Sequence, residues 1–309
     1  MTIILIRYAE IGLKSTPVRR RFEIALKDNI LNMLMRDGVE AIVTHKGARF
    51  YVETDDLDAA VASLRRVFGI ASMSVAEECT SKIEDMCRAA AEYSLPRLSG
   101  GQSFAVKARR EGSQGYTSLD MGREIGSAIF LANEDKGIRV DLTDPDVTFY
   151  VEARDDRAFI FCDYIRCHAG LPVGTQGKVI AYIDRSERSI VSAWLMMKRG
   201  CRALMAGDGD FSVLRQYDTH LRAYDENSED RVKVLGIVMG TDLDGLDSVD
   251  VSQYQLPVFF PTVGMTDEEV SSLYRDISAG LRGLRYQRSF SSCSSTAMFL
   301  SAAISLNFS

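Results

Sequence analysis

The chain has 309 residues, of which 46% are hydrophobic and 26% are charged, so it can form two or three compact units with separate cores. Its formal net charge is −6, so the protein as a whole is not basic, and any surface that binds nucleic acid must be a local positive patch. No apolar run reaches the roughly 18 residues of a membrane span, and the N-terminus lacks the features of a signal peptide. The six cysteines include no C-x-x-C pair, which argues against a zinc site and indicates buried thiols in a reducing cytoplasm.

Residues 1–78 predict a first unit with the element order βαββαβ, which is the ferredoxin-like arrangement. Thr16 and Pro17 supply a helix N-cap and a proline at the first helical position, and Gly38 ends that helix. The predicted strands and helices span residues 2–8, 16–38, 40–44, 48–53, 56–68 and 69–76.

Four cations crowd the loop before this first helix and its first turn. Positive charge at a helix N-terminus opposes the helix dipole, so the stability of the fold does not explain them. A phosphate-binding patch explains them, with a solvated charged face as the alternative. The four candidate residues are Lys14, Arg19, Arg20 and Arg21.

Residues 79–168 predict a second α/β unit. The pattern Ser81-Lys-Ile-Glu84 matches a capping box that opens a helix. The predicted elements span residues 81–93, 103–109, 117–133, 147–153 and 158–165.

The strand at 103–109 ends in three cations, Lys107, Arg109 and Arg110. Strand alternation places Lys107 and Arg109 on one face of the sheet. We expect Arg123, on the following helix, to join them and extend a second candidate RNA-binding patch.

Residues 169–309 predict a third unit that begins with the glycine-rich join at 169–177. Apolar strands alternate with helices, which indicates a doubly wound parallel sheet whose ligands bind beyond the carboxyl ends of the strands. Asp184–Ser189 and Gly240–Asp244 lie at such ends. The predicted elements are strands at 178–183, 201–206, 231–239 and 257–260 and helices at 189–199, 211–224 and 267–281.

The loop Asp184-Arg-Ser-Glu-Arg-Ser189 stands between a strand and a helix, where backbone N–H groups form a natural anion site. Phosphate must approach such a loop closely, and glycines normally allow this, but this loop has no glycine. The candidate nucleotide-binding residues are Asp184, Arg185, Ser186, Arg188, Ser189, Gly240 and Asp242.

Three motifs together resemble the tRNA 4-thiouridine synthetase (tRNA sulfurtransferase) family. The first, Arg7–Ser15, reads RYAEIGLKS and matches the family's opening except that alanine replaces a glycine. The second joins Phe104–Arg110 to Asp144–Glu152 and is similar to the THUMP RNA-binding domain. The third joins Gly170–Val179 to Met196–Cys201.

The resemblance implies a ferredoxin-like domain at 1–78, a THUMP domain at 79–168 and a PP-loop ATP pyrophosphatase-like domain at 169–309. It also implies a homodimer that adenylates a uridine in tRNA before persulfide sulfur displaces AMP, with a link to thiamine biosynthesis. The family's loop reads Ser-Gly-Gly-x-Asp-Ser, and only Ser189 of it is kept here. Carboxylates stand near the polyphosphate position and Arg188 replaces the loop's acid, which argues against pyrophosphate release. The loop's two arginines could still attract phosphate, so ATP stays a possible but doubtful ligand.

Three functional hypotheses follow. In the first, the chain binds tRNA, has lost adenylation, and works with a separate sulfur donor or adenylating enzyme. In the second, it is an active tRNA sulfurtransferase with a variant loop; in the third, it is a nucleotide-sensing or scaffold protein that binds no RNA. Basic motifs at two family-matched places disfavour the third, and the altered loop favours the first over the second.

No residue is assigned a catalytic role or a metal. Cys201 and Cys293 are interpreted as structural thiols rather than sulfur carriers, and the three histidines are interpreted as structural. The tail beyond Arg282 stays unassigned, and its apolar end, Met298–Phe308, is either a docked helix or a docked strand.

Overall fold

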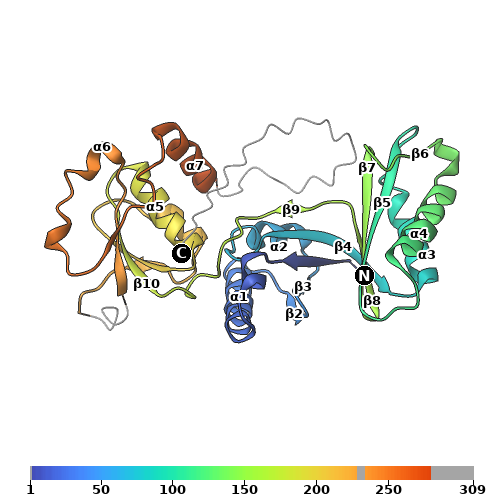
Figure 1. Ribbon diagram of the computed structural model, residues 1–309, viewed down its shortest axis with the longest axis horizontal. Coiled ribbons are helices and arrows are strands. Elements are labelled where there is room, and N and C mark those ends of the chain that lie inside the picture. The colour runs from blue at the N-terminus through green and yellow to red at the C-terminus, as the bar shows by residue number, and fades with distance from the viewer. Residues whose placement is uncertain (1, 228–233, 280–309) are drawn as a thin grey trace.

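The computed structural model of the protein describes residues 2–227 and 234–279. Three modules lie in a row, with the N-terminal module in the middle (Figure 1). The first two modules share one nine-stranded sheet, and the third has its own five-stranded sheet. The predicted mixed α/β architecture is therefore confirmed. The predicted tail segments lie outside the described residues.

The first module has the predicted βαββαβ order, with strands arranged β2-β3-β1-β4 and antiparallel throughout. Alternate residues of β1, Ile4 and Ile6, pack against Phe22 of α1 in a core that α1 and α2 cover. Strand β2 ends at Lys46, two residues beyond the predicted end at residue 44, because the hairpin turns tightly at residues 47–48. The elements are β1 (Thr2–Arg7), α1 (Thr16–Arg36), β2 (Ile42–Lys46), β3 (Arg49–Glu53), α2 (Leu57–Leu64) and β4 (Ser72–Thr80).

Strand β4 belongs to two modules at once. It pairs with β1 from Ser72 to Glu77 and with β8 from Glu77 to Thr80, antiparallel in both cases. The expected boundary between residues 78 and 79 therefore falls inside a strand. Backbone hydrogen bonds of one continuous sheet run across this boundary. The independence of the two units stays a prediction.

The second module packs α3 and α4 against the continuation of this sheet. A capping box opens α4, where Thr117 accepts from the N–H of Asp120 and the Asp120 carboxylate accepts from the N–H of Thr117. The capping box predicted at Ser81 is wrong: Lys82 is the N-cap residue of α3 and its side chain caps nothing, because β4 continues to Thr80 and the helix starts later. The elements are α3 (Ile83–Ser94), β5 (Ser103–Glu111), α4 (Ser118–Ala132), β6 (Arg139–Val140), β7 (Val147–Arg154), β8 (Arg157–Phe161) and β9 (Ile165–Arg166).

The glycine-rich segment at 169–177 forms a tight join. The N–H of Leu171 donates to the carbonyl of Lys198 at 2.9 Å, and the N–H of Gly174 donates to the carbonyl of Gly200 at 2.9 Å. Gly170 has φ +77°, and a Cβ atom there would lie 2.2 Å from the Lys198 carbonyl oxygen. Glycine is therefore required at this position both by backbone conformation and by space.

An aromatic cluster joins the first module to the third. Phe68 packs edge-on against Trp194, with ring centroids 5.2 Å apart, and stacks on Tyr217 at 5.5 Å. His168 lies against all three rings. Burial lowers the pKa of His168 to about 4, so the imidazole is neutral and takes the structural role expected for it.

The third module is the predicted doubly wound parallel sheet, with strand order β12-β11-β10-β13-β14. The helix predicted at 211–224 is wrong. A short 3-10 helix, Ser212–Gln216, stands there, because Asp218 accepts from the N–H of His220 and turns the chain into β12. The elements are β10 (Lys178–Tyr182), α5 (Glu187–Lys198), β11 (Arg202–Ala206), β12 (Arg222–Ala223), β13 (Val234–Val238), α6 (Leu243–Leu246), β14 (Val258–Phe259) and α7 (Asp267–Ala279).

The strand order of this sheet reverses between β10 and β13, which defines the switch point where doubly wound sheets bind ligands. Both predicted nucleotide-binding segments follow these two strands. Across the described ranges, no helix combines the length and the apolar character needed to cross a membrane.

Candidate nucleic-acid and nucleotide sites

The predicted cations of β5 divide between the two faces of the sheet. Val106 and Ala108 face the core beneath α4, so Lys107 and Arg109, which alternate with them, point to the opposite face. Both cations are exposed. The helices of both N-terminal modules cover the side of the sheet that carries Val106 and Ala108. We call the opposite side, which carries Lys107 and Arg109, the open face.

Arg110 and Arg123 lie on the helical side and do not join that patch. Arg110 follows the alternation of Ala108, and its guanidinium donates to the carbonyl of Gly112 at 3.1 Å. Arg123 projects from α4, which packs closely on β5 through Gly122. The expectation that Arg123 completes one patch with Lys107 and Arg109 is corrected, because the sheet stands between them.

A buried charge cluster on the open face was missed by sequence reasoning. Glu152 of β7 is 4% exposed, and its carboxylate accepts from Nη2 of Arg7 at 2.9 Å. Arg49 and Arg154 approach its second oxygen at 3.6 and 3.3 Å. Burial raises the pKa of Glu152, but the arginines outweigh burial and hold the pKa below its ordinary value.

This cluster carries more positive than negative charge and rests on aromatic rings. The guanidinium of Arg7 lies over Phe161 and Tyr164, at 4.7 and 4.5 Å from the ring centroids. Arg157 lies in the same way over Tyr51 and Phe159. Ion pairs with Glu152 and with Glu78, together with these ring contacts, hold Arg7 and Arg157 in place. The sequence signal was present, since Arg7 opens one quoted motif and Glu152 closes another.

The four predicted cations near α1 lie around the N-terminus of that helix, as expected. Arg20 and Arg21 border an open groove of about 540 Å³ beside Pro17 and Ile24. No acidic residue occupies the first turn of the helix. Lys14 precedes the helix, and Arg19 is half-buried with an Nε atom that has no hydrogen-bond partner.

Tyr8 links the α1 cations to the open-face cluster. Burial raises the pKa of Tyr8, its hydroxyl donates to Glu23, and both Arg19 and Arg49 lie close enough to oppose that shift. Tyr8 is therefore near one of the α1 cations, Arg19, and one arginine of the open-face cluster, Arg49.

The loop after β10 caps its own helix. The N–H and the hydroxyl of Ser186 both donate to the Asp184 carboxylate, at 2.7 and 2.6 Å. The Ser186 hydroxyl in turn accepts from the N–H of Ser189 at 3.3 Å. Burial raises the pKa of Asp184, but these hydrogen bonds lower it further than burial raises it, so the carboxylate stays charged. Side chains thus occupy backbone donors that a phosphate would use.

Arg188 does not face the open side of the loop. Its guanidinium is buried and donates to the carbonyls of Thr262 and Met265, at 2.8 and 3.1 Å, and to the Asp267 carboxylate at 2.6 Å. These contacts tie α5 to the start of α7. Arg185, by contrast, is 87% exposed and approaches Asp208 at 3.4 Å.

The second predicted segment lies directly against the first. A Cβ atom at Gly240 would lie 2.5 Å from the backbone nitrogen of Ser189, so the loop after β13 packs on the N-terminus of α5. Asp242 caps the short helix α6 by accepting from the N–H of Gly245 at 2.8 Å. The structure therefore brings the predicted nucleotide residues together. Asp184, Ser186 and Ser189 are hydrogen-bonded to one another. Arg185, Arg188 and Asp242 are instead paired with groups outside the predicted set.

Cysteine chemistry is weak throughout the part of the chain that the structure describes. Burial raises the pKa of Cys79 to about 11 and those of Cys162 and Cys167 to about 12. Cys201 is buried, and burial raises its pKa as well. These thiols stay protonated near neutral pH and are poor nucleophiles. Cys293 lies outside the described residues, and no metal-binding cluster of His, Cys, Asp or Glu is found among the described ones.

Fold and site together define a class: an α/β protein with a sheet that carries cations on one face and a C-terminal parallel-sheet module whose first switch-point loop caps its own helix. The family model described as ThiI ferredoxin-like domain matches residues 3–74, and the model described as THUMP domain matches residues 80–163. The chain therefore carries these two domains and is similar to the tRNA sulfurtransferase (4-thiouridine synthetase) family. The resemblance stated from the three motifs is thereby confirmed.

Curated relatives place the likeness more exactly. The chain is 38% identical over 201 residues to a probable tRNA sulfurtransferase of Methanosarcina acetivorans, which covers 64% of this chain and 48% of that protein. It is 37% identical over 207 residues to a probable tRNA sulfurtransferase of Methanobrevibacter smithii, covering 65% and 52%. The chain thus spans about half the length of the curated relatives that it matches.

Two solved structures share the fold. The crystal structure of PH1313 from Pyrococcus horikoshii superposes with a TM-score of 0.75 at 27% identity, covering 90% of this chain and 99% of that one. A 4-thiouridine synthetase in complex with RNA, with bound ATP, superposes with a TM-score of 0.71 at 22% identity, covering 91% and 86%.

Proposed function

We propose that this protein binds tRNA through its first two modules and has lost the adenylation step of its family. The cations of the open face, with those at the start of α1, supply phosphate contacts. Similarity to the family supports tRNA as the nucleic acid. The net charge of −6 leaves these two regions as local positive surfaces on an acidic protein, which favours one binding orientation over non-specific attraction.

The single observation that carries the loss of adenylation is the self-capped loop. A catalytic nucleotide loop presents free N–H groups to phosphate, whereas here Asp184 and Ser186 accept those of Ser186 and Ser189. A phosphate would have to displace a carboxylate that is itself negatively charged. Removing one preorganised donor typically costs about 10²–10³ in rate, and two donors are occupied here.

Sulfur transfer then requires another protein. Burial raises the pKa of every described cysteine, so these thiols are poor nucleophiles. We therefore infer that a separate donor supplies persulfide sulfur and that a separate enzyme activates the uridine. The chain would act as the tRNA-binding member of such a pair, and a homodimer, as in the family resemblance, is the expected assembly. Size-exclusion chromatography with light scattering measures that assembly directly.

The test combines binding with turnover. The purified full-length chain is mixed with unfractionated tRNA and labelled ATP, with and without a persulfide donor. We expect tRNA binding without tRNA-dependent release of AMP. AMP release that depends on tRNA and is lost in Arg185→Ala would instead support the active sulfurtransferase with a variant loop. Absence of any tRNA binding would favour the third hypothesis, a scaffold that binds no RNA.

A further inference from the structure

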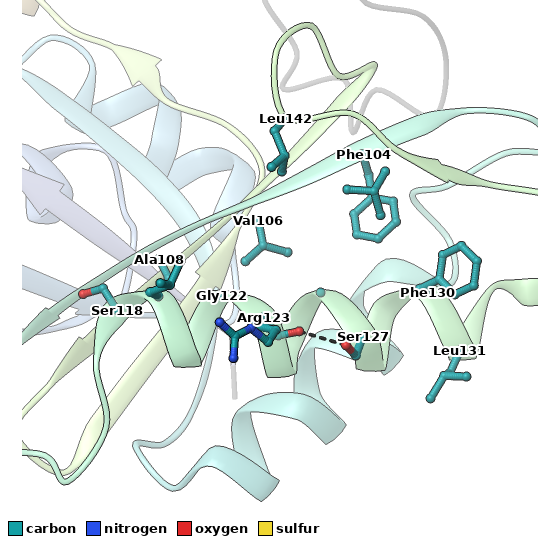
Figure 2. A pocket seen from close by; sticks show the side chains of 13 residues that line it. Phe104, Val106, Ala108, Ser118, Gly122, Arg123, Ser127, Phe130, Leu131 and Leu142 are labelled. Carbon is teal, nitrogen blue, oxygen red and sulfur yellow. Dashed lines mark hydrogen bonds between the residues drawn. The ribbon is translucent and has the colours of Figure 1, made fainter.

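An apolar groove of about 800 Å³ runs along the second module between α4 and the outer edge of β5 (Figure 2). Val106 and Ala108 form its floor together with the small residues of α4. Leu119 and Leu142, at its rim, are 72% and 75% exposed. An open apolar groove with two exposed leucines at its rim is a candidate site of association.

The same groove lies beside an unpaired sheet edge. β5 pairs with β7 along its length, but β6 pairs with Ser103 and Phe104 and then ends. Along that edge the carbonyls of Gln102 and Phe104 accept from the N–H groups of residues 139 and 141, so even-numbered residues of β5 direct their backbone groups outward.

By this alternation, the N–H and C=O groups of Val106, Ala108 and Arg110 also point outward. None of them has a backbone partner within the ranges that the structure describes. An extended peptide can pair with such an edge, and alternate side chains of that peptide then enter a neighbouring groove.

The charges beside the edge decide what kind of strand fits. Side chains of an added strand that do not enter the groove lie on the open face, beside Lys107 and Arg109. β5 of a second copy would bring the same two cations there, and like charges on neighbouring strands are destabilising. Acidic residues at these positions would pair with them instead.

We propose that β5 and α4 form a docking site for an extended segment of a protein partner in which apolar residues alternate with Asp or Glu. The apolar side chains of the segment fill the groove, and its acidic side chains face Lys107 and Arg109. Its backbone pairs with the edge of β5 that is left free after β6 ends. This proposal does not rest on tRNA binding or on the state of the nucleotide loop.

The test uses fluorescent eight-residue peptides in which valine alternates with glutamate or with lysine, titrated onto the full chain and followed by anisotropy. We expect the glutamate peptide to bind at least about tenfold more tightly than the lysine peptide, the factor that corresponds to about 1.4 kcal/mol. Binding should slow amide hydrogen exchange at Val106 and Ala108. A double reversal, Lys107→Glu with Arg109→Glu, should invert the preference between the two peptides.

Groove variants and a matched control complete the design. Leu142→Asp changes an exposed side chain and should weaken the glutamate peptide about tenfold, whereas Met35→Asp, equally exposed on α1, should not. Equal binding of both peptides, or no effect of Leu142→Asp, overturns the proposal. So does peptide binding that appears only after deletion of residues 280–309, which would make the chain's own tail the occupant. A dimer that Leu142→Asp dissociates would assign the groove to a second copy.

Discussion

At the residue scale, Glu152 holds three arginines together across two modules, so it contributes stability as well as arranging the open face. Replacing it with glutamine leaves Arg7 and Arg49 without their counter-charge in a largely buried site. We expect Glu152→Gln to lower the free energy of unfolding by about 3 kcal/mol at pH 7, measured by urea denaturation.

The pH dependence of that loss has a definite sign. The pKa of Glu152 is lower in the folded protein than its ordinary value of 4.5, so its contribution is complete above pH 4.5. It declines as the pH falls through the folded pKa, where the carboxyl becomes protonated and resembles glutamine. The difference between wild type and Glu152→Gln should therefore shrink in acid, and a difference that stays constant to pH 3 would contradict the ionic role.

At the same scale, we expect the two arginines of the loop after β10 to differ in their contribution to the free energy of unfolding. Arg188→Gln removes buried bonds to Thr262 and Asp267 and should destabilise the protein by about 2 kcal/mol. Arg185→Gln changes an exposed side chain and should stay within about 0.5 kcal/mol. Urea denaturation of both variants, with and without ATP, measures this. Equal destabilisation would show that Arg188 does not act as the tie between α5 and α7.

At the scale of elements, Gly170 has the tightest surroundings of the glycines in the join at 169–177. In Gly170→Ala the alanine would have to adopt a positive φ, and its Cβ atom would clash with the Lys198 carbonyl. We therefore expect this variant to lower the free energy of unfolding by more than about 3 kcal/mol. Gly137→Ala is the control, because φ is +60° there and no atom lies within 4 Å of the added Cβ. It should cost about 1–2 kcal/mol. Similar losses in the two variants would mean that the join relaxes around the methyl group.

At the scale of the whole molecule, the open face should dominate RNA affinity. Lys107→Ala with Arg109→Ala removes two phosphate contacts and should make the slope of log K against log salt shallower by about 1.4–1.8, measured by filter binding with tRNA. Arg110→Ala with Arg123→Ala removes the same charge from the helical side and should change the slope little. Equal slopes for the two pairs would show that tRNA does not distinguish the faces of the sheet.

Much of this protein was determined by its sequence alone. Apolar periodicity predicted the βαββαβ order and the parallel sheet after residue 178, because core-facing residues recur with the period of each element. The same reading identified the loop at Asp184–Ser189 as altered, since missing glycines and added carboxylates are visible without coordinates. Local errors, at Ser81 and at 211–224, occurred where neighbouring strands and turns overrode local propensity.

Only the tertiary structure decided how distant residues are paired. Arg188 contacts Thr262, which follows it by 74 residues, and Arg7 contacts Glu152, which follows it by 145. β4 runs through the boundary expected at residue 78, and β5 leaves an edge unpaired because β6 is short. Strand alternation alone put Lys107 and Arg109 on one face, but which face the helices cover depends on packing across the whole sheet. Periodicity is a local property of the chain, whereas these pairings arise from long-range contacts that no local pattern encodes.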